Sequence, residues 1–234
     1  NFIGRLTINP EQKQYGVTAE FNVNLQKFSD IPFLKYFWLG LVVPFVYAEN
    51  NIQLSQFDIQ NEGTTGPTDI VNSFKRASLL YSKMDGKQKA KGIPEIKVKL
   101  GVKYMAEGGF EISAGSTAVI PTISSVDPAY LFQPMLGNNK HFGFGVTLNF
   151  NVPLSAKDAN FEVSWYLDGE NNYFLKATKN RVLDLKDKPW SRYLLVRKEG
   201  ESTTIPAANV LNIPVSVKPY NYANLATGLR LKTT

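Results

Sequence analysis

Hydrophobic and polar residues alternate strictly over residues 142–152. Every even position in this stretch is apolar, and the odd positions between them are glycine, threonine or asparagine. A period of two is typical of a β-strand with one apolar and one polar face. Eleven residues at about 3.3 Å each extend about 36 Å, enough to cross an apolar band of about 25 Å at a tilt of about 45°. Strands in soluble sheets usually have about five or six residues, so the length favours a membrane β-barrel.

The same alternation predicts about ten strands along the chain. A turn at residues 153–160 joins the first stretch to a strand at residues 161–170, and a turn at residues 106–109 makes a second tight hairpin. The other strands are expected at residues 2–8, 15–27, 36–47, 94–104, 110–120, 191–198, 209–217 and 223–231. Because proline has no N–H to donate, Pro44 and Pro214 indicate a sheet edge, a bulge or a strand end.

Residues 36–47 are apolar at both odd and even positions. Periodicity therefore cannot orient this strand. Either it is buried on both faces in the core of a sandwich, or it is a wall strand of a barrel whose inner face meets a plug or a folded-in loop.

The alternation stops between residues 49 and 91. Residues 62–67 have the composition of a loop. Apolar residues then recur at spacings of three and four, which predicts a short helix over residues 68–85 with Thr68 or Asp69 as its cap and Gly86 at its end. A basic, flexible stretch is expected at residues 83–92. The helix is expected to pack on the sheet or to close a barrel end, with a partner-binding helix as the alternative.

The connections alternate in length. Long ones are predicted at residues 49–91, 121–140 and 176–189, and short ones at 106–109 and 153–160. Outer-membrane barrels have short periplasmic turns and long external loops in this order. The alternation of long and short connections fails at residues 9–14 and 220–222, where the connections are short but long loops are required. The final residues of the chain also lack the aromatic ending that is common in such barrels. We therefore expect that loop residues or a terminus are missing from this chain.

Composition is compatible with one all-β domain over residues 1–234. The chain has no cysteine, which excludes disulfides, thiol catalysis and cysteine metal sites. It also lacks a run of eighteen apolar residues and therefore a transmembrane helix. The net charge of +6 is dispersed and no nucleic-acid-binding motif accompanies it, so a nucleic-acid partner is not expected.

Candidate catalytic chemistry is scarce. His141 is the only histidine, and it lies at a strand start where a structural position is expected. Glu162, Asp168 and Glu170 share one strand face but spread over roughly 26 Å, which is a charged lining and not a catalytic pair. We expect no enzyme activity, no cofactor and no metal site.

The polar strand faces are the candidate functional surface. If the apolar faces meet lipid, the opposite faces line a lumen, and rings of charge there set ion preference. The charged residues assigned to this lining are Arg5, Glu20, Glu95, Lys97, Lys99, Lys103, Glu111, Glu162, Asp168, Lys218 and Arg230. Six are basic and five acidic, so weak selectivity is expected. Lys97, Lys99 and Lys103 share one strand and form either a local anion-attracting stripe or a solvated face.

Several segments resemble a poorly characterised group of bacterial outer-membrane β-barrel proteins of porin type. They are WLGLVVPFVYAEN, GIPEIKVKLGVKY, the strand ending in AVIPT, AYLFQPMLGNNKHFGFGVTLNF and KPWSRYLLVRKEG, together about half of the chain. The resemblance implies an antiparallel transmembrane barrel in the bacterial outer membrane, a passive channel, and no catalytic residues. The positive charge departs from the group, in which many members are acidic.

We therefore expect an outer-membrane β-barrel with long loops on one side, one of them carrying a helix, that forms a passive pore for small hydrophilic solutes or ions. Its expected partner is outer-membrane lipid, with a homo-oligomer or a membrane complex as a further option. The alternative is a soluble β-sandwich or jelly roll, acting as a structural or carbohydrate-binding module of the capsid or adhesin kind.

Overall fold

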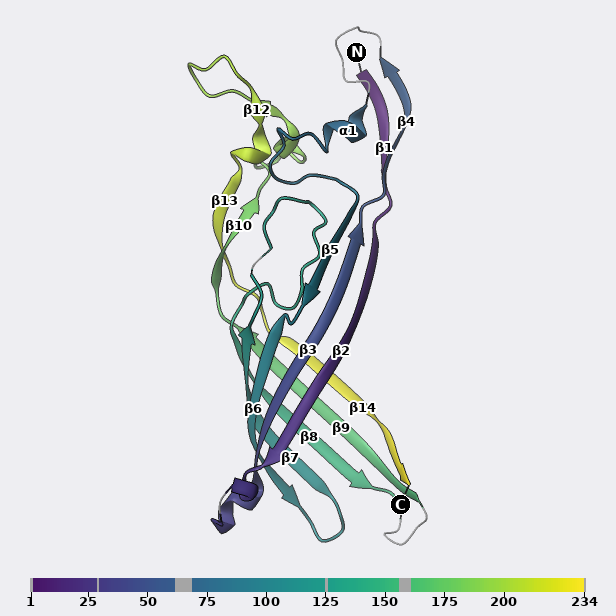
Figure 1. Cartoon of the computed structure of the whole chain (residues 1–234), viewed down its shortest axis with the longest axis vertical. Coiled ribbons are helices and arrows are strands. Elements are labelled where there is room, and N and C mark those ends of the chain that lie inside the picture. Colours follow the sequence, from purple (N-terminus) through teal and green to yellow (C-terminus); the bar gives the residue numbers. More distant parts are fainter. Residues whose placement is uncertain (1, 29, 62–68, 125, 156–160, 234) are drawn as a thin grey trace.

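The computed structural model describes residues 2–28, 30–61, 69–124, 126–155 and 161–233. Its main element is an antiparallel sheet with the strand order β14-β9-β8-β7-β6-β3-β2. These strands are β2 (Glu11–Asn24), β3 (Phe37–Asn51), β6 (Glu95–Met105), β7 (Glu111–Pro121), β8 (Gly143–Pro153), β9 (Phe161–Phe174) and β14 (Tyr222–Thr233). The sheet curls into a half-barrel with β2 and β14 at its two edges (Figure 1). The predicted antiparallel β architecture is confirmed, whereas the strands in the described part of the chain do not form a closed barrel.

The apolar strand faces point outward from the curled sheet and the polar faces point inward. Along β8, Val146 is 62% exposed and Leu148 44%, while Thr147 between them is only 5% exposed. The regular antiparallel register carries this order across the other wall strands. The exception is β3, which is apolar on both faces and places Val42, 9% exposed, on the concave side. The convex face is therefore hydrophobic and the concave face polar, which reverses the usual arrangement of a water-soluble protein.

Three short strands continue wall strands in line beyond a brief interruption. β1 (Phe2–Ile8) leads into β2, β5 (Lys87–Gly92) leads into β6, and β9 leads into β10 (Ala177–Val182). β4 (Leu54–Asn61) continues β3 and pairs with β1, and β13 (Asn212–Val217) precedes β14 and pairs with β10. The sheet thus extends at one end into two ribbons, at the top of Figure 1.

This continuity explains the exceptions in the predicted loop rhythm. Residues 9–10 and 218–221 join strands that run in the same direction, so they are interruptions and not hairpin turns. The prediction that loop residues are missing at these two places assumes a hairpin turn at each of them. That assumption was wrong, because no loop is needed there. Elsewhere the long connections meet at the ribbon end and the hairpin at residues 106–110 lies at the opposite end (Figure 1).

The two prolines that are expected to mark interrupted or edge pairing, Pro44 and Pro214, lie at such places. On one side of β3, β6 pairs with residues 37–42 and β5 with residues 46–51. Pro44 falls in the gap between these two pairings. Pro214 lies on β13, in a ribbon of two strands. Both positions agree with the prediction that proline marks interrupted or edge pairing.

The predicted helix over residues 68–85 is wrong for most of its length. Only α1 (Ile70–Ser73) is helical; Asp69 caps it by accepting a hydrogen bond from the Asn72 backbone N–H at 2.9 Å, and residue 68 lies outside the described residues. The following segment pairs through Lys83 with Tyr130 on the β7–β8 connection. In this segment Leu79 and Met84 are buried, whereas Ala77, which belongs to the predicted helical spacing, is exposed. Tertiary contacts therefore override the helical pattern.

Other connections also differ from expectation. The stretch expected to be flexible contains β5, and the long connections expected at residues 49–91 and 176–189 also contain β4 and β10. The strand expected at residues 191–198 is reduced to a 3₁₀ turn η3 (Ser191–Tyr193) and β11 (Leu195–Val196), which pairs with β12 (Ile205–Pro206). The remaining short helices are η1 (Leu25–Phe28), η2 (Pro32–Tyr36) and η4 (Ala207–Asn209). The loop at 62–67 and residues 156–160 of the turn lie outside the described residues.

The connections at the ribbon end fold together into what we call the cap: residues 69–94, 122–124, 126–142 and 175–221. Leu79, Val182 and Ala208 form its apolar cluster. The Tyr193 hydroxyl donates a hydrogen bond to the Ser82 carbonyl at 2.8 Å, which joins distant parts of the cap. Figure 1 shows the β7–β8 connection between β5 and β10. Among the described residues, no helix is long and apolar enough to cross a membrane.

Candidate functional site

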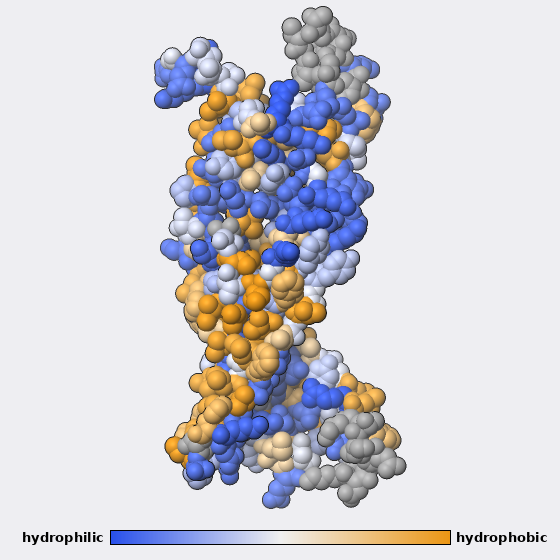
Figure 2. Space-filling view, in the orientation of Figure 1, coloured by the Kyte–Doolittle hydropathy of each residue, from blue (hydrophilic) through white to orange (hydrophobic). Residues whose placement is uncertain are grey.

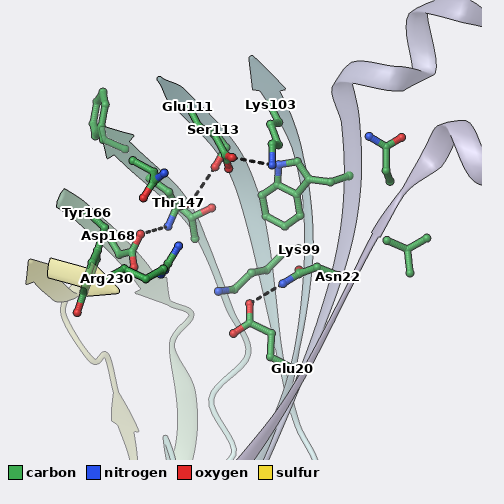
Figure 3. A pocket seen from close by; sticks show the side chains of 16 residues that line it. Glu20, Asn22, Lys99, Lys103, Glu111, Ser113, Thr147, Tyr166, Asp168 and Arg230 are labelled. Atoms are coloured by element: carbon green, nitrogen blue, oxygen red, sulfur yellow. Dashed lines mark hydrogen bonds and ion pairs between the residues drawn. The ribbon is translucent and has the colours of Figure 1, made fainter. Parts of the chain in front are cut away.

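A polar hollow of about 540 Å³ lies on the concave face of the sheet. Six of the predicted lining residues surround it: Glu20, Lys99, Lys103, Glu111, Asp168 and Arg230. They come from β2, β6, β7, β9 and β14, so the hollow belongs to the whole wall. In Figure 3 Lys99 and Arg230 point into the hollow from its opposite sides. The three positive and three negative charges in this lining balance each other.

The register of the sheet explains why these side chains meet. Lys103 lies opposite Ser113, Ser113 opposite Asn149, and Asn149 opposite Asp168, in one row across β6, β7, β8 and β9. The Ser113 hydroxyl donates to the Asn149 amide oxygen at 3.2 Å, and the Asn149 amide donates to Asp168 at 2.8 Å (Figure 3). At the end of the row Lys103 forms an ion pair with Glu111 at 2.8 Å. The polar groups therefore form a hydrogen-bonded lining.

A second set of contacts crosses the concave face. The Lys97 and Lys99 ammonium groups on β6 lie 2.5 and 3.4 Å from the carboxylate of Glu170 on β9. The Asn172 amide donates to the same carboxylate. Two strands, β7 and β8, separate β6 from β9 in the sheet, so these side chains reach one another only because the sheet is strongly curled. We call this set the cross-sheet bridge.

The indole ring of Trp38 packs against three glycines of the sheet. A Cβ on Gly101 would come within 2.7 Å of the indole ring, and a Cβ on Gly115 or Gly40 within 3.0 Å. These three glycines belong to β6, β7 and β3, so the ring of Trp38 covers three strands. Trp38 also lines the hollow. β3, the strand that is apolar on both faces, thus places an aromatic ring on the concave side of the sheet. The ring has room there because the residues beneath it are glycines.

The five other predicted lining residues lie elsewhere. Lys97 belongs to the cross-sheet bridge, and Glu162 borders a neighbouring hollow of about 550 Å³ together with Arg230. Glu95 is half-buried and accepts a hydrogen bond from Asn138 of the cap. Arg5 forms an ion pair at 3.5 Å with Asp58 on the β1–β4 ribbon, and the Lys218 ammonium lies 5.9 Å from the Tyr173 ring centre. Arg5, Glu95 and Lys218 therefore do not line the hollow.

Several residues of the hollow were not among the charged candidates. Asn22, Trp38, Thr147, Asn149 and Tyr166 also line it. Asn22, Thr147, Asn149 and Tyr166 lie on the polar faces of alternating strands, so the two-residue period would have found them once uncharged polar side chains were included. Trp38 had no such signal, because its strand is apolar on both faces. The cross-strand role of Glu170 had no sequence signal, because it depends on curvature.

The lysine stripe is largely compensated within the sheet. Lys97 and Lys99 share the Glu170 carboxylate, and Lys103 is paired with Glu111. The Arg230 guanidinium lies 5.3 Å from the Tyr166 ring centre. The hollow can therefore contact a solute through hydroxyl, amide and paired charged groups, with little net charge.

His141, the only histidine of the chain, occupies a structural position. His141 is buried, and its Nδ1 lies 2.8 Å from the Leu175 carbonyl, which is a structural contact at the start of β8. No group of three or more histidine, aspartate or glutamate residues there is arranged to hold a metal ion.

Comparison with known proteins adds no identification. No family model matches the chain, and neither a curated protein nor a solved structure matches it.

Proposed function

We propose that this chain forms the wall of a bacterial outer-membrane β-barrel, and that its polar hollow is part of a passive pathway for small hydrophilic solutes or ions. The observation that carries the proposal is the reversed polarity of the sheet. Large apolar side chains such as Val17, Val146 and Leu229 are mostly exposed on the convex face, whereas the hollow on the concave face is charged and polar. An exposed apolar surface of this extent needs lipid or protein to cover it.

The dimensions of the wall agree with a bilayer. Tyr15 and Tyr47 lie opposite each other near the ribbon end, and Tyr36 and Tyr104 lie near the other end. The ten residue-to-residue steps from Phe37 to Tyr47 extend about 33 Å along β3, or about 23 Å in height at a tilt of about 45°. Aromatic residues at two such levels are typical of the girdles of membrane barrels. Figure 2 shows hydrophobic residues around the middle of the molecule and mostly hydrophilic ones above them.

The strand directions limit how such a barrel can close. All six pairings along the path from β2 to β14 are antiparallel, so these two edge strands run in the same direction. They cannot pair with each other antiparallel. If two copies of the chain lay in the membrane in the same orientation, β14 of one copy and β2 of the other would also run in the same direction. Antiparallel closure therefore requires an odd number of further strands between β14 and β2.

The competing interpretation is a soluble sandwich or carbohydrate-binding module. In a sandwich a second sheet covers the apolar face. Here the apolar side chains of the convex face are exposed in the described part of the chain. The soluble interpretation thus needs a partner protein over the whole convex face.

Fractionation of the native protein tests the proposal first. We expect the protein in the detergent-extracted outer-membrane fraction, with a heat-dependent shift in gel mobility and a stepwise conductance in planar bilayers. A protein that stays in the aqueous fraction without detergent would refute the membrane wall. Membrane residence without conductance would retain the wall and refute the pathway.

A further inference from the structure

The indole ring of Trp38 lies along one cross-strand row of the sheet. The row continues from Trp38 through Gly101 on β6 and Gly115 on β7 to Thr147 on β8. A Cβ on Gly101 would come within 2.7 Å of two atoms of the indole, and a Cβ on Gly115 within 3.0 Å of one of them. The ring therefore extends from β3 over β6 toward β7, with one face against the glycines. Because Trp38 lines the hollow, the other face of the ring is turned toward it.

Polar rows run on both sides of this ring. Asn149 and Asp168 belong to the row on one side, and Asn22 and Lys99 belong to the row on the other. Each row is displaced by two residues along the strands from the row of Trp38, so the two polar rows are about 13 Å apart. All four polar side chains line the hollow (Figure 3). A flat apolar surface thus lies between two sets of hydrogen-bonding groups.

The row of Trp38 itself ends in a hydroxyl group that is not used. Thr147 lines the hollow and is only 5% exposed. Its hydroxyl has no hydrogen-bond partner among the residues that the structure describes. Buried polar groups are normally hydrogen-bonded, so this position calls for a further donor or acceptor beside the ring.

The charged groups around the ring already have partners. Asp168 accepts a hydrogen bond from the Asn149 amide at 2.8 Å, and the Lys99 ammonium lies 3.4 Å from the Glu170 carboxylate. A carboxylate has about four acceptor positions, so these groups can take part in further hydrogen bonds while they stay paired. An ion would compete with the existing pairs. A neutral hydroxyl group, which both donates and accepts, fits among them.

We propose that the solute of this hollow is a neutral saccharide whose pyranose ring stacks on Trp38. The face of an indole ring is negative, whereas the C–H groups on one face of a pyranose carry a small positive charge, so the two faces attract each other. The hydroxyl groups at the rim of the sugar then point toward the two polar rows. The volume of about 540 Å³ lies in the range of about 300–1,000 Å³ that is typical of small-molecule sites. This inference rests on the proposed function, because it names the solute class of the same hollow.

The test measures binding by isothermal titration calorimetry, with the whole chain in micelles of an alkyl amine oxide, a detergent without a sugar headgroup. The probes are maltotriose and cellotriose, and choline is the comparison because an organic cation also binds to aromatic faces. We expect saccharide binding that Trp38→Leu weakens by about tenfold or more. Asp168→Ala should weaken it by about threefold or more. Trp190→Leu, at an exposed tryptophan of the cap, should bind within about twofold of the original chain.

Fluorescence keeps the test valid if Trp38→Leu does not fold. The chain has three tryptophans, so the double variant Trp165→Phe and Trp190→Phe leaves Trp38 as the only one. Stacking of a sugar should then change the emission of Trp38 and saturate at the affinity that calorimetry gives. An emission that does not respond to a bound saccharide would refute stacking on this ring.

Three further results would overturn the saccharide site. They are the absence of binding for both trisaccharides, equal binding by the Trp38→Leu and Trp190→Leu variants, and Trp38-dependent binding of choline without binding of saccharide. Conductance separates this inference from the proposed pathway. A protein that conducts ions but binds neither trisaccharide refutes the saccharide site alone, whereas binding without conductance retains the site and refutes the pathway.

Discussion

Glycine on the concave face permits the tight curl of the sheet. A Cβ on Gly145 would overlap the Asn171 carbonyl and the Asn172 side chain, whereas a Cβ on Gly169, which faces outward, would have ordinary contacts at 3.6 Å. Gly145, on β8, lies in the cross-strand row that runs from Lys99 on β6 to Asn172 on β9, two residues of the cross-sheet bridge. Curvature at this point brings Glu170 within reach of Lys97 and Lys99.

We expect Gly145→Ala to destabilise the wall by roughly 1–3 kcal/mol, because the added methyl group forces the backbone apart at an overpacked position. Gly169→Ala is the matched control and should have little effect. Urea unfolding of both variants in lipid vesicles measures the difference. Equal stability of the two variants would show that curvature does not depend on the inward glycine.

The cross-sheet bridge sets the charge of the pathway in the proposed pore. Removing the Glu170 carboxylate with Glu170→Gln leaves Lys97 and Lys99 without their shared partner. We expect the anion-to-cation permeability ratio to rise by about twofold or more, since unpaired charges at a constriction govern ion preference. Reversal potentials in planar bilayers measure this ratio, and Glu201→Gln, an exposed position in the cap, is the control. An unchanged ratio would place the bridge outside the ion path.

At the scale of the elements, a local ion pair stabilises the segment that connects β10 to β13. Asp184 accepts hydrogen bonds from the Arg192 side chain at 2.8 and 3.1 Å and from its backbone N–H at 3.0 Å. The hydrogen bonds from Arg192 lower the pKa of Asp184 to about 2. The bidentate geometry ties η3 to the end of β10.

The lowered pKa gives a pH dependence of defined sign. In the unfolded chain an aspartate has a pKa near about 3.9, so the ion pair stabilises the cap fully above that pH, and the stabilisation is lost as the pH falls toward about 2. Asp184 is partly exposed, so we expect the effect to stay below about 1 kcal/mol. An NMR titration of the Arg192 Nε–H signal should show a midpoint near 2. A midpoint close to the unfolded value would contradict the pairing, and Asp184→Asn should abolish the transition.

At the scale of the whole molecule, the convex face distinguishes a membrane wall from a soluble sheet. Val146→Arg places a charge near the middle of that face, on β8. If lipid covers the face, the substitution should cost roughly 2–4 kcal/mol of folding free energy in vesicles. Leu195→Arg changes an exposed apolar residue of the cap and should cost little. Similar, small effects of both substitutions would exclude lipid contact at Val146.

The sequence by itself determined the wall strands and their two faces. Alternation with a period of two depends only on the geometry of an extended chain, so the positions of β2, β6, β7, β8, β9 and β14 and the inward direction of Lys99 or Asp168 followed from the pattern. The hairpin turn at residues 106–109 followed as well. These features are local, and no distant contact was needed to set them.

Only the tertiary structure decided which residues meet across the sheet. Glu170 reaches Lys97 because the sheet curls, and curvature is a sum over many residues that no single spacing records. The segment at residues 74–85 lost its helical form because Leu79 and Met84 are buried among distant connections, whose contacts outweigh helix propensity. The connections at residues 69–94, 122–142 and 175–221 contain 16 lysine and arginine residues against 7 aspartate and glutamate residues. This positive charge gathers in the cap because connections far apart in sequence emerge at the same end of antiparallel strands, which is a consequence of topology.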